Sequence, residues 1–430
     1  MGAPGEIAWY RLDNAAKIFP PTSKKSDTRV FRFSCELCEA VDGGLLQAAL
    51  ERTIDDFPGF CCVLKRGMFW YYLEQSDIHP LVREEDSPPC STVYLERKTL
   101  LFDVTWYGKR INLEVYHVLT DGTGALQFLK TLVLHYLKAA HPEAIDAEIH
   151  TDFDGSETQK MADSFDRHYE SKKSKMKLKA PAAYQIKGAK EAEWRLNIIE
   201  GSVSTAALLK KAREYDAKIT VLITAILARA IYAEMNVRDK EKPVVINVPV
   251  NLRNYFDSKS TRNFFSVVYI QYDFKGENDT LEDVVNGMKE NFDGLLSKEH
   301  MKERLNKLIG FERNLLIRPV PLAIKNLYMN IAYSFAAREV TATLSNMGKV
   351  DMPEETKPCI KLFDVFCSTN KLQVCICSYG DVMNISFTSV FVSTDIQRNF
   401  FRQLTELGID VEISANNLRG NGGGEQSEKL

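Results

Sequence analysis

The residues best suited to chemistry in this sequence lie together between His117 and Gly122, where the chain reads His-Val-Leu-Thr-Asp-Gly. Before them, residues 110–116 alternate between polar and apolar side chains, which predicts a half-buried strand. After them, residues 124–134 carry apolar side chains at helical spacing. We therefore expect His117 at the end of a strand and Asp121 at the start of a helix.

A histidine at such a junction is suited to act as a general base. Its unperturbed pKa of about 6.5 lets it accept a proton near neutral pH. Asp121 is better placed to orient the structure, because a carboxylate is favoured beside the unpaired amide groups at a helix start. Gly122 then allows a tight turn. The alternative is a histidine at a strand end that precedes an Asp-Gly turn by chance, and the rest of the chain has to decide between the two.

The composition is that of an ordinary globular protein. The 430 residues are 45% hydrophobic and 26% charged, and they exceed the size of one usual core, which predicts two domains of about 200 residues. A net charge of −3 without a long basic stripe argues against a nucleic-acid-binding protein. Residues 1–11 lack the pattern of a signal peptide, and no apolar run reaches the length of a membrane span, so we expect a cytoplasmic protein.

The nine cysteines predict reduced thiols that pack in the protein. Cys35 and Cys38 have C-x-x-C spacing, but they fall in the alternating stretch 29–38, where side chains three residues apart point to opposite faces of a strand. No second pair of cysteines or histidines follows at the spacing of a zinc site. We therefore expect no metal site and no metal dependence.

The order of expected elements divides the chain into two halves, each of which mixes strands with helices, and predicts an α/β fold. An N-terminal domain is expected over 1–160 and a C-terminal domain over 193–419. A charged, lysine-rich linker over 161–192 separates them, and its basic residues could instead form a patch for an anionic ligand. A polar, glycine-rich tail over 420–430 is expected to be disordered.

The individual elements follow from periodicity and from breakers such as glycine and proline. Expected strands cover 29–38, 60–65, 69–73, 92–97, 99–106, 110–117, 193–199, 244–249, 264–274, 339–345, 361–369, 371–379 and 383–390. Expected helices cover 45–54, 124–140, 206–215, 220–235, 281–298, 301–315 and 394–407.

Further segments connect the motif to a known family. Residues 246–253 read Ile-Asn-Val-Pro-Val-Asn-Leu-Arg, and 261–265 read Thr-Arg-Asn-Phe-Phe. With the His-x-x-x-Asp-Gly motif upstream, this order resembles the chloramphenicol acetyltransferase-like superfamily, which includes the condensation domains of peptide synthetases. Residues 9–14, Trp-Tyr-Arg-Leu-Asp-Asn, and 344–348, Leu-Ser-Asn-Met-Gly, resemble the bacterial alcohol acetyltransferases of that superfamily.

The resemblance covers nearly the whole chain and implies two similar domains with a channel between them and His117 at its middle. The acyl donor, either acyl-CoA or the phosphopantetheine of an acyl-carrier protein, would enter from one side, and a small-molecule alcohol or amine acceptor from the other. No tightly bound cofactor is implied. His117 would take the acceptor's proton during attack on the thioester and return it to the thiolate. The sequence has no Gly-x-Ser-x-Gly nucleophile elbow, in keeping with direct transfer.

The remaining site residues are expected to hold the motif or to line the channel. Asp121 would pair with Arg253, while the Gly122 amide and the Ser345 hydroxyl are candidates to bind the oxyanion. Serine and asparagine at these places could instead be turn residues. The candidates for the channel are Asn251, Arg253, Asn263, Ser345 and Asn346.

Three other interpretations stay open from the sequence. The chain could be a catalytically silent relative that binds a carrier protein or another partner. It could be a stand-alone condensation enzyme that forms amides from carrier-bound acyl groups, although those enzymes commonly have a second histidine directly before the motif histidine, where this chain has Tyr116. Lastly, the motif could be accidental in a non-enzymatic α/β protein, which a fold without a channel around His117 would establish.

Overall fold

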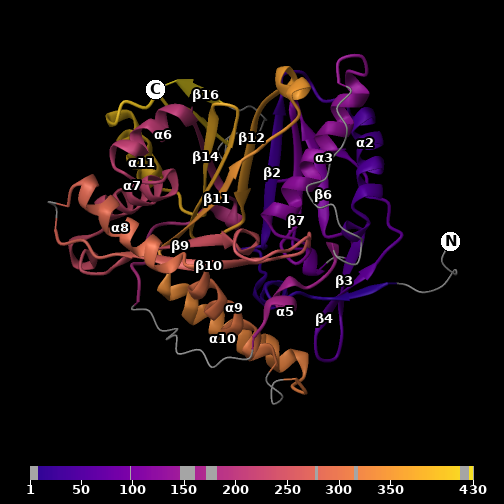
Figure 1. Cartoon of the computed structure of the whole chain (residues 1–430), viewed down its shortest axis with the longest axis horizontal. Helices are drawn as coiled ribbons and strands as arrows, with labels where there is room; N and C mark the ends of the chain where they lie inside the picture. The colour runs from indigo at the N-terminus through magenta and orange to yellow at the C-terminus, as the bar shows by residue number, and fades with distance from the viewer. Residues whose placement is uncertain are drawn as a thin grey trace.

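The computed structural model of the chain describes residues 8–96, 98–145, 160–170, 182–276, 279–313, 318–416 and 426–429. Two sheets lie in the middle of the molecule, with helices on their outer sides (Figure 1). The first sheet has the order β12 (Ile360–Cys367), β2 (Val30–Leu37), β7 (Arg110–Tyr116), β6 (Phe102–Tyr107) and β5 (Arg83–Glu84). Helices α2 (Gly43–Asp56) and α3 (Gly122–Ala140) pack against each other beside this sheet.

The second sheet is larger and runs β10 (Phe265–Tyr272), β9 (Val244–Asn251), β11 (Ala342–Lys349), β13 (Leu372–Tyr379), β14 (Val382–Ser389), β8 (Asn197–Ser204), β15 (Glu412–Ala415) and β16 (Gln426–Lys429). Strand β11 pairs in parallel with both of its neighbours, while the other pairs are antiparallel, so the sheet is mixed. On the outer side of this sheet are α6 (Thr205–Glu214), α7 (Ile219–Ala233), α8 (Leu281–Leu295) and α11 (Asp395–Glu406) (Figure 1). The predicted α/β class is confirmed.

Smaller elements complete the described chain. A three-stranded sheet has the order β1 (Trp9–Arg11), β4 (Tyr71–Gln75) and β3 (Cys62–Arg66). The other helices are α1 (Phe19–Thr22), α5 (Ser164–His168), α9 (Lys298–Arg313) and α10 (Leu322–Ala336). In the described part of the chain, no helix is both long and apolar enough to cross a membrane.

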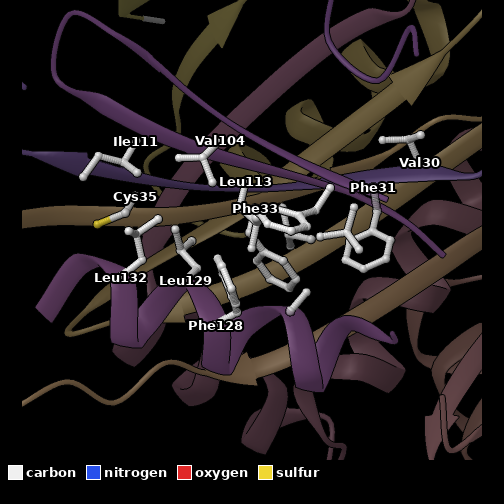
Figure 2. Packing of buried hydrophobic residues seen from close by; sticks show 14 of the residues in the cluster. Val30, Phe31, Phe33, Cys35, Val104, Ile111, Leu113, Phe128, Leu129 and Leu132 are labelled. Atoms are coloured by element: carbon white, nitrogen blue, oxygen red, sulfur yellow. The ribbon is translucent and has the colours of Figure 1, made fainter. Parts of the chain in front are cut away.

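The core beside the first sheet fixes α3, and with it the start of that helix. Phe33 and Cys35 of β2 point toward Phe128, Leu129 and Leu132 of α3 (Figure 2), and all five side chains are fully buried. Alternate residues of a strand and residues three to four apart on a helix each share one face, so the two periodic patterns meet here. Burial of each large side chain contributes about 1.5–3 kcal/mol, which holds the helix against the sheet.

Strand β12 joins the two halves of the chain. It follows β11 of the second sheet in sequence but pairs antiparallel with β2 of the first, with Phe363 opposite Cys35. The chain returns to the second sheet at Leu372, where β13 begins. The strand predicted at 361–369 is therefore present, but it belongs to the sheet formed by the N-terminal half.

Several segments differ from the sequence-based expectations. The strand predicted at 92–97 is wrong: Tyr94–Glu96 form a 3-10 turn, and the strand that pairs with β6 at this edge is the short β5. No element was predicted between 315 and 339, where α10 lies. Within the expected linker 161–192, Ser164–His168 form α5, and residues 171–181 lie outside the described residues. Of the expected tail, residues 426–429 pair with β15 as β16, and the rest lies outside the described residues.

Candidate active site

The junction between β7 and α3 presents His117 and Asp121 as the sequence predicts. Strand β7 ends at Tyr116, and the His117 amide donates to the carbonyl of Arg29 at 3.0 Å, which anchors the turn. Asp121 is the N-cap of α3, where its Oδ1 accepts from the amides of Thr123 and Gly124, both at 3.1 Å. The carboxylate thus satisfies two of the donors that a helix start leaves unpaired.

The other carboxylate oxygen of Asp121 connects this helix to the C-terminal half. Oδ2 lies 2.7 Å from a guanidinium nitrogen of Arg253 and accepts from the Phe264 amide at 2.8 Å. Arg253 also donates to the carbonyls of Ser260 at 2.8 Å and of Arg262 at 2.6 Å. The ion pair expected from the sequence is present and largely buried, and it joins the start of α3 to the C-terminal half.

Two glycines permit the close approach of the halves at this place. A Cβ on Gly124 would lie 2.3 Å from the carbonyl oxygen of Thr261, and a Cβ on Gly122 would lie 2.7 Å from the methyl carbon of Met347. The first is a contact with backbone, which cannot yield as a flexible side chain can. Gly124 is therefore needed for α3 to meet the 261–265 segment.

The imidazole of His117 is held in one tautomer by a chain of side chains. Its Nδ1 lies 3.0 Å from Oδ1 of Asn263, whose Nδ2 donates to Oδ2 of Asp13 at 3.1 Å. A carboxylate only accepts, so the amide nitrogen of Asn263 must face Asp13 and its oxygen must face the ring. Nδ1 then carries the proton, and the lone pair of Nε2 is left for chemistry.

Asp13 is itself fixed in a buried position. Its Oδ1 accepts from the Ala16 amide at 2.7 Å, and its Oδ2 lies 3.4 Å from a guanidinium nitrogen of Arg262. Asp13 is 1% exposed. Sequence reasoning missed both Asp13 and Arg262 as parts of the site, although each lies in a segment that carried the family resemblance. The 250 residues that separate Asp13 from Asn263 hid their contact.

Aromatic rings surround the imidazole. Phe19 stacks on it at a centroid distance of 4.5 Å, Phe31 approaches at 4.9 Å and Phe265 at 5.4 Å. Burial lowers the pKa of His117 below 6.5, outweighing the Asp121 charge and the bond to Asn263, which act to raise it. The imidazole is consequently neutral at pH 7, the state in which it can accept a proton.

A cavity of about 900 Å³ lies between the two sheets and is lined by His117. Its walls come from both halves of the chain, with Phe33 and Val365 from the first sheet and Val250 from the second. Many of the side chains that line the cavity with His117 are apolar. They are Phe19, Phe31, Phe33, Val250, Phe265, Met347 and Val365. The volume suits a small-molecule substrate, since ligand sites fall in the range of about 300–1,000 Å³.

An exposed part of the same lining is cationic. Arg213 and Lys218, on either side of the turn between α6 and α7, are exposed, and Lys289 of α8 is paired with Asp216. Arg213, Lys218 and Lys289 outnumber Asp216 and Asp293 in this part of the lining, so it carries a small net positive charge, which favours an anionic ligand.

The structure brings the predicted site residues together in two layers. Gly122, Asn251, Ser345 and Asn346 line the cavity with His117 and Asp121, whereas Arg253 and Asn263 lie behind them and hold the motif. The Asn251 amide donates to the Thr123 hydroxyl at 3.1 Å, and the Asn346 amide to the Thr220 hydroxyl at 2.9 Å. Across the described residues there is no cluster of histidine, cysteine or acidic side chains that could hold a metal ion.

Comparisons with known proteins extend the fold argument. No family model matches the chain, and no curated protein matches it in sequence. Among solved structures, trichothecene 15-O-acetyltransferase from Fusarium sporotrichioides is similar, with a TM-score of 0.62 and 10% sequence identity. The match covers 95% of this chain and 96% of the acetyltransferase chain. The first condensation domain of the calcium-dependent antibiotic synthetase, solved with a substrate analogue, has a TM-score of 0.61 and 16% sequence identity. This match covers 93% of this chain and 96% of the condensation domain.

A third similar structure is the starter condensation domain of rhizomide synthetase in complex with C8-CoA and Leu-SNAC, with a TM-score of 0.60 and 12% identity over 93% of this chain and 94% of that one. The chain therefore has the fold of condensation domains and of an O-acetyltransferase, as the resemblance implied. The closer resemblance to bacterial alcohol acetyltransferases stays a prediction.

Proposed function

We propose that this protein is an acyltransferase, which moves an acyl group from a thioester donor to an alcohol or amine acceptor with His117 as general base. The observation that carries the proposal is the imidazole of His117, which lines a cavity between two sheets and has its Nδ1 bonded to Asn263. The fold shared with condensation domains and an O-acetyltransferase supports the same reaction class.

In the proposed reaction, Nε2 of His117 takes the proton from the acceptor as its oxygen or nitrogen attacks the thioester carbonyl carbon. The tetrahedral intermediate collapses, the carbon–sulfur bond breaks, and the imidazolium returns the proton to the thiolate. The products are an ester or amide and a free thiol. Asp121 and Asn263 position the base in this scheme, and neither contacts the reacting atoms.

The intermediate carries an oxyanion, and donors directed at it supply a large share of catalysis. We assign this role to the Ser345 hydroxyl and the Gly122 amide. Both residues line the cavity with His117, Gly122 from the start of α3 and Ser345 from β11 of the second sheet. In the described part of the chain, the Ser345 hydroxyl makes no hydrogen bond to another side chain, so it is free to turn toward a substrate.

The donor we favour is acyl-CoA. Arg213 and Lys218, in the exposed part of the lining, are suited to bind the phosphates of CoA or of a carrier-bound phosphopantetheine. Rhizomide synthetase's starter domain, which shares the fold, was solved with C8-CoA. We favour a small acceptor over carrier-bound amide formation because Tyr116 is buried with its hydroxyl 2.8 Å from that of Ser23, so position 116 places no second base in the cavity.

The proposal is tested by incubating the full chain with acyl-CoAs of increasing chain length and a panel of alcohols and amines, followed by mass spectrometry of the products. We expect an acylated acceptor and free CoA in equal amounts. Hydrolysis of acyl-CoA without an acylated acceptor would contradict the transfer reaction. Products formed only from acyl-carrier protein would replace CoA by the carrier as donor, and no product from either would indicate a silent binding protein.

A further inference from the structure

The outer face of α10 carries a stripe of large apolar side chains on the molecular surface. Ile324, Leu327, Tyr328, Ile331 and Phe335 follow each other at spacings of one, three or four residues, so they share one side of the helix. Their exposed fractions run from 49% for Ile331 to 66% for Tyr328. A helix of a globular protein normally turns such a stripe toward the core.

The turn between β3 and β4 enlarges this surface. The amide of Leu322, at the start of α10, donates to the Met68 carbonyl at 2.9 Å, and Lys325 Nζ donates to the Phe69 carbonyl at 3.2 Å. Met68 is 75% exposed. We call the combined surface the α10 patch; it consists of Met68, Phe69, Ile324, Leu327, Tyr328, Ile331 and Phe335. In Figure 1, α10 lies at the lower edge of the molecule, away from the two sheets.

The charge around the α10 patch is mainly positive, with Glu74, Glu312 and Glu339 as nearby acidic residues. Three segments meet here: 63–73 and 318–338 at the bonds just described, and 17–25 where Asn330 Nδ2 donates to the Pro21 carbonyl at 2.6 Å. None of the three contains an aspartate or glutamate. Their basic residues are Lys17, Lys24, Lys25, Lys65, Arg66, Arg318, Lys325 and Arg338. Of these, Lys24, Lys25, Arg66, Arg318 and Arg338 are exposed, whereas Lys325 is buried. Acidic side chains from outside these segments pair with only some of them, Glu312 with Lys17 and Glu74 with Lys65.

We propose that the α10 patch binds the surface of an anionic lipid bilayer, with the apolar side chains inserted between headgroups and the basic residues above them. An amphipathic helix with aromatic and aliphatic residues on one side and flanking lysine and arginine is suited to lie in that interface. The flanking cations gain further from the negative surface potential of anionic lipids. The protein would lie on the membrane and not cross it.

A second copy of the chain fits this patch less well. In a twofold symmetric contact the same surface faces itself, so the exposed basic residues of the three segments would lie opposite one another. Like charges opposed in this way disfavour association. An acidic protein would satisfy the charges, but a convex helix with a continuous apolar stripe is better matched by lipid than by a polar protein surface.

The position of α10 gives membrane binding a use. Helix α1 packs against α10, and Phe19, the first residue of α1, stacks on the imidazole of His117. Binding through the α10 patch would therefore place the bilayer one helix away from the residue that stacks on His117, near the cavity that a lipophilic substrate has to enter. This use rests on the proposed function, whereas vesicle binding is measured without turnover, so the two can fail separately.

The test is co-sedimentation of the full chain with vesicles of equal parts phosphatidylglycerol and phosphatidylcholine, compared with pure phosphatidylcholine. We expect binding to the anionic vesicles, weakened by salt, and a loss of at least tenfold in the partition coefficient for the double variant Leu327→Ser, Ile331→Ser. The matched control replaces Leu81 and Val237, which are 73% and 84% exposed on other surfaces, by serine and should bind as the unchanged protein does.

The result that overturns the proposal is equal partitioning of the double variant and the unchanged protein, or no partitioning at all. Sedimentation velocity, of the protein alone and with an acidic carrier protein, tests the two other possible occupants of the patch. A concentration-dependent dimer that the double variant abolishes would assign the patch to a second copy. Binding of an acidic carrier protein in the absence of vesicle binding would assign it to that partner. Both results would contradict a lipid surface.

Discussion

Two regions of this molecule reverse the usual distribution of side chains, and they do so in opposite directions. Between the sheets, the charged Asp121 and Asp13 are buried; Asp121 pairs with the largely buried Arg253, and Asp13 accepts from Asn263. On α10, large apolar side chains such as Leu327 and Phe335 face outward. Buried charge and exposed apolar surface each cost free energy, so neither arrangement is expected from stability alone.

The difference supports the roles that we propose for the two regions. The buried polar groups have defined partners at 2.7–3.4 Å, which fixes the position and tautomer of His117. Among the described residues, the apolar side chains of the α10 patch have no such fixed partners and instead present exposed apolar surface. Departures from local rules concentrate at functional sites, and here one departure builds a fixed site while the other leaves a surface for a partner.

The largest expected effect is on folding, through Asp121→Asn. Asparagine can still cap α3, but the largely buried ion pair between Asp121 and Arg253 is lost. We expect the free energy of unfolding to fall by about 3–5 kcal/mol, measured by chemical denaturation. Glu74→Gln, which breaks the exposed pair with Lys65, should change little.

The same denaturation experiment on the double variant Leu327→Ser, Ile331→Ser should show no loss, because both side chains are exposed. An Asp121→Asn protein that keeps its stability and loses only activity would contradict the structural role of the carboxylate, and with it the contrast between the two regions.

A smaller effect is expected from Asn263→Ala, which removes the bond to Nδ1 of His117. A positioned general base contributes roughly 10²–10⁴ to the rate, and we expect loss of its positioning to lower kcat/KM by roughly tenfold to a hundredfold. The bond raises the pKa of His117, so the pH midpoint of kcat/KM should also move downward in the variant. A fall in rate with an unchanged midpoint would indicate a purely structural role for Asn263.

The smallest effect concerns the pH profile of the unchanged protein. Burial lowers the pKa of His117, so the neutral imidazole persists below pH 6.5. The reaction needs this neutral form, and kcat/KM should therefore be constant at neutral pH and fall only as the pH drops through a midpoint below 6.5. A midpoint above 6.5 would mean that charge and not burial dominates the surroundings of the imidazole.

Much of the fold could be predicted from periodicity because the elements are amphipathic and their cores are local. The segments 110–116 and 124–134 gave β7 and α3 with small errors at the ends. The apolar side chains of α10 follow a helical spacing, but the helix was missed because the prolines directly before it, Pro319 and Pro321, resemble loop sequence. The sequence could not predict which sheet β12 joins, because its pairing with β2 connects residues 330 positions apart and leaves no local signal.

The site was predictable to the extent that it is contiguous. The His117 to Gly122 motif places base and cap within six residues, and its chemistry follows from residue type. Asp13, Asn263 and Arg253 meet the motif only through the tertiary fold. The resemblance pointed to Asn263 and Arg253, but the role of Asn263 in holding the tautomer required the direction of its amide, which Asp13 fixes.

The most direct test of the account is acceptor-dependent thiol release from acyl-CoA by the unchanged protein, by His117→Ala and by His135→Ala. His135 lies on α3 with its Nε2 3.0 Å from Asp56, outside the cavity lining, so it is a matched control. We predict that thiol release falls by a factor of roughly 10²–10⁴ in His117→Ala and is retained in His135→Ala. Release that survives in His117→Ala would contradict the central claim that this imidazole is the base.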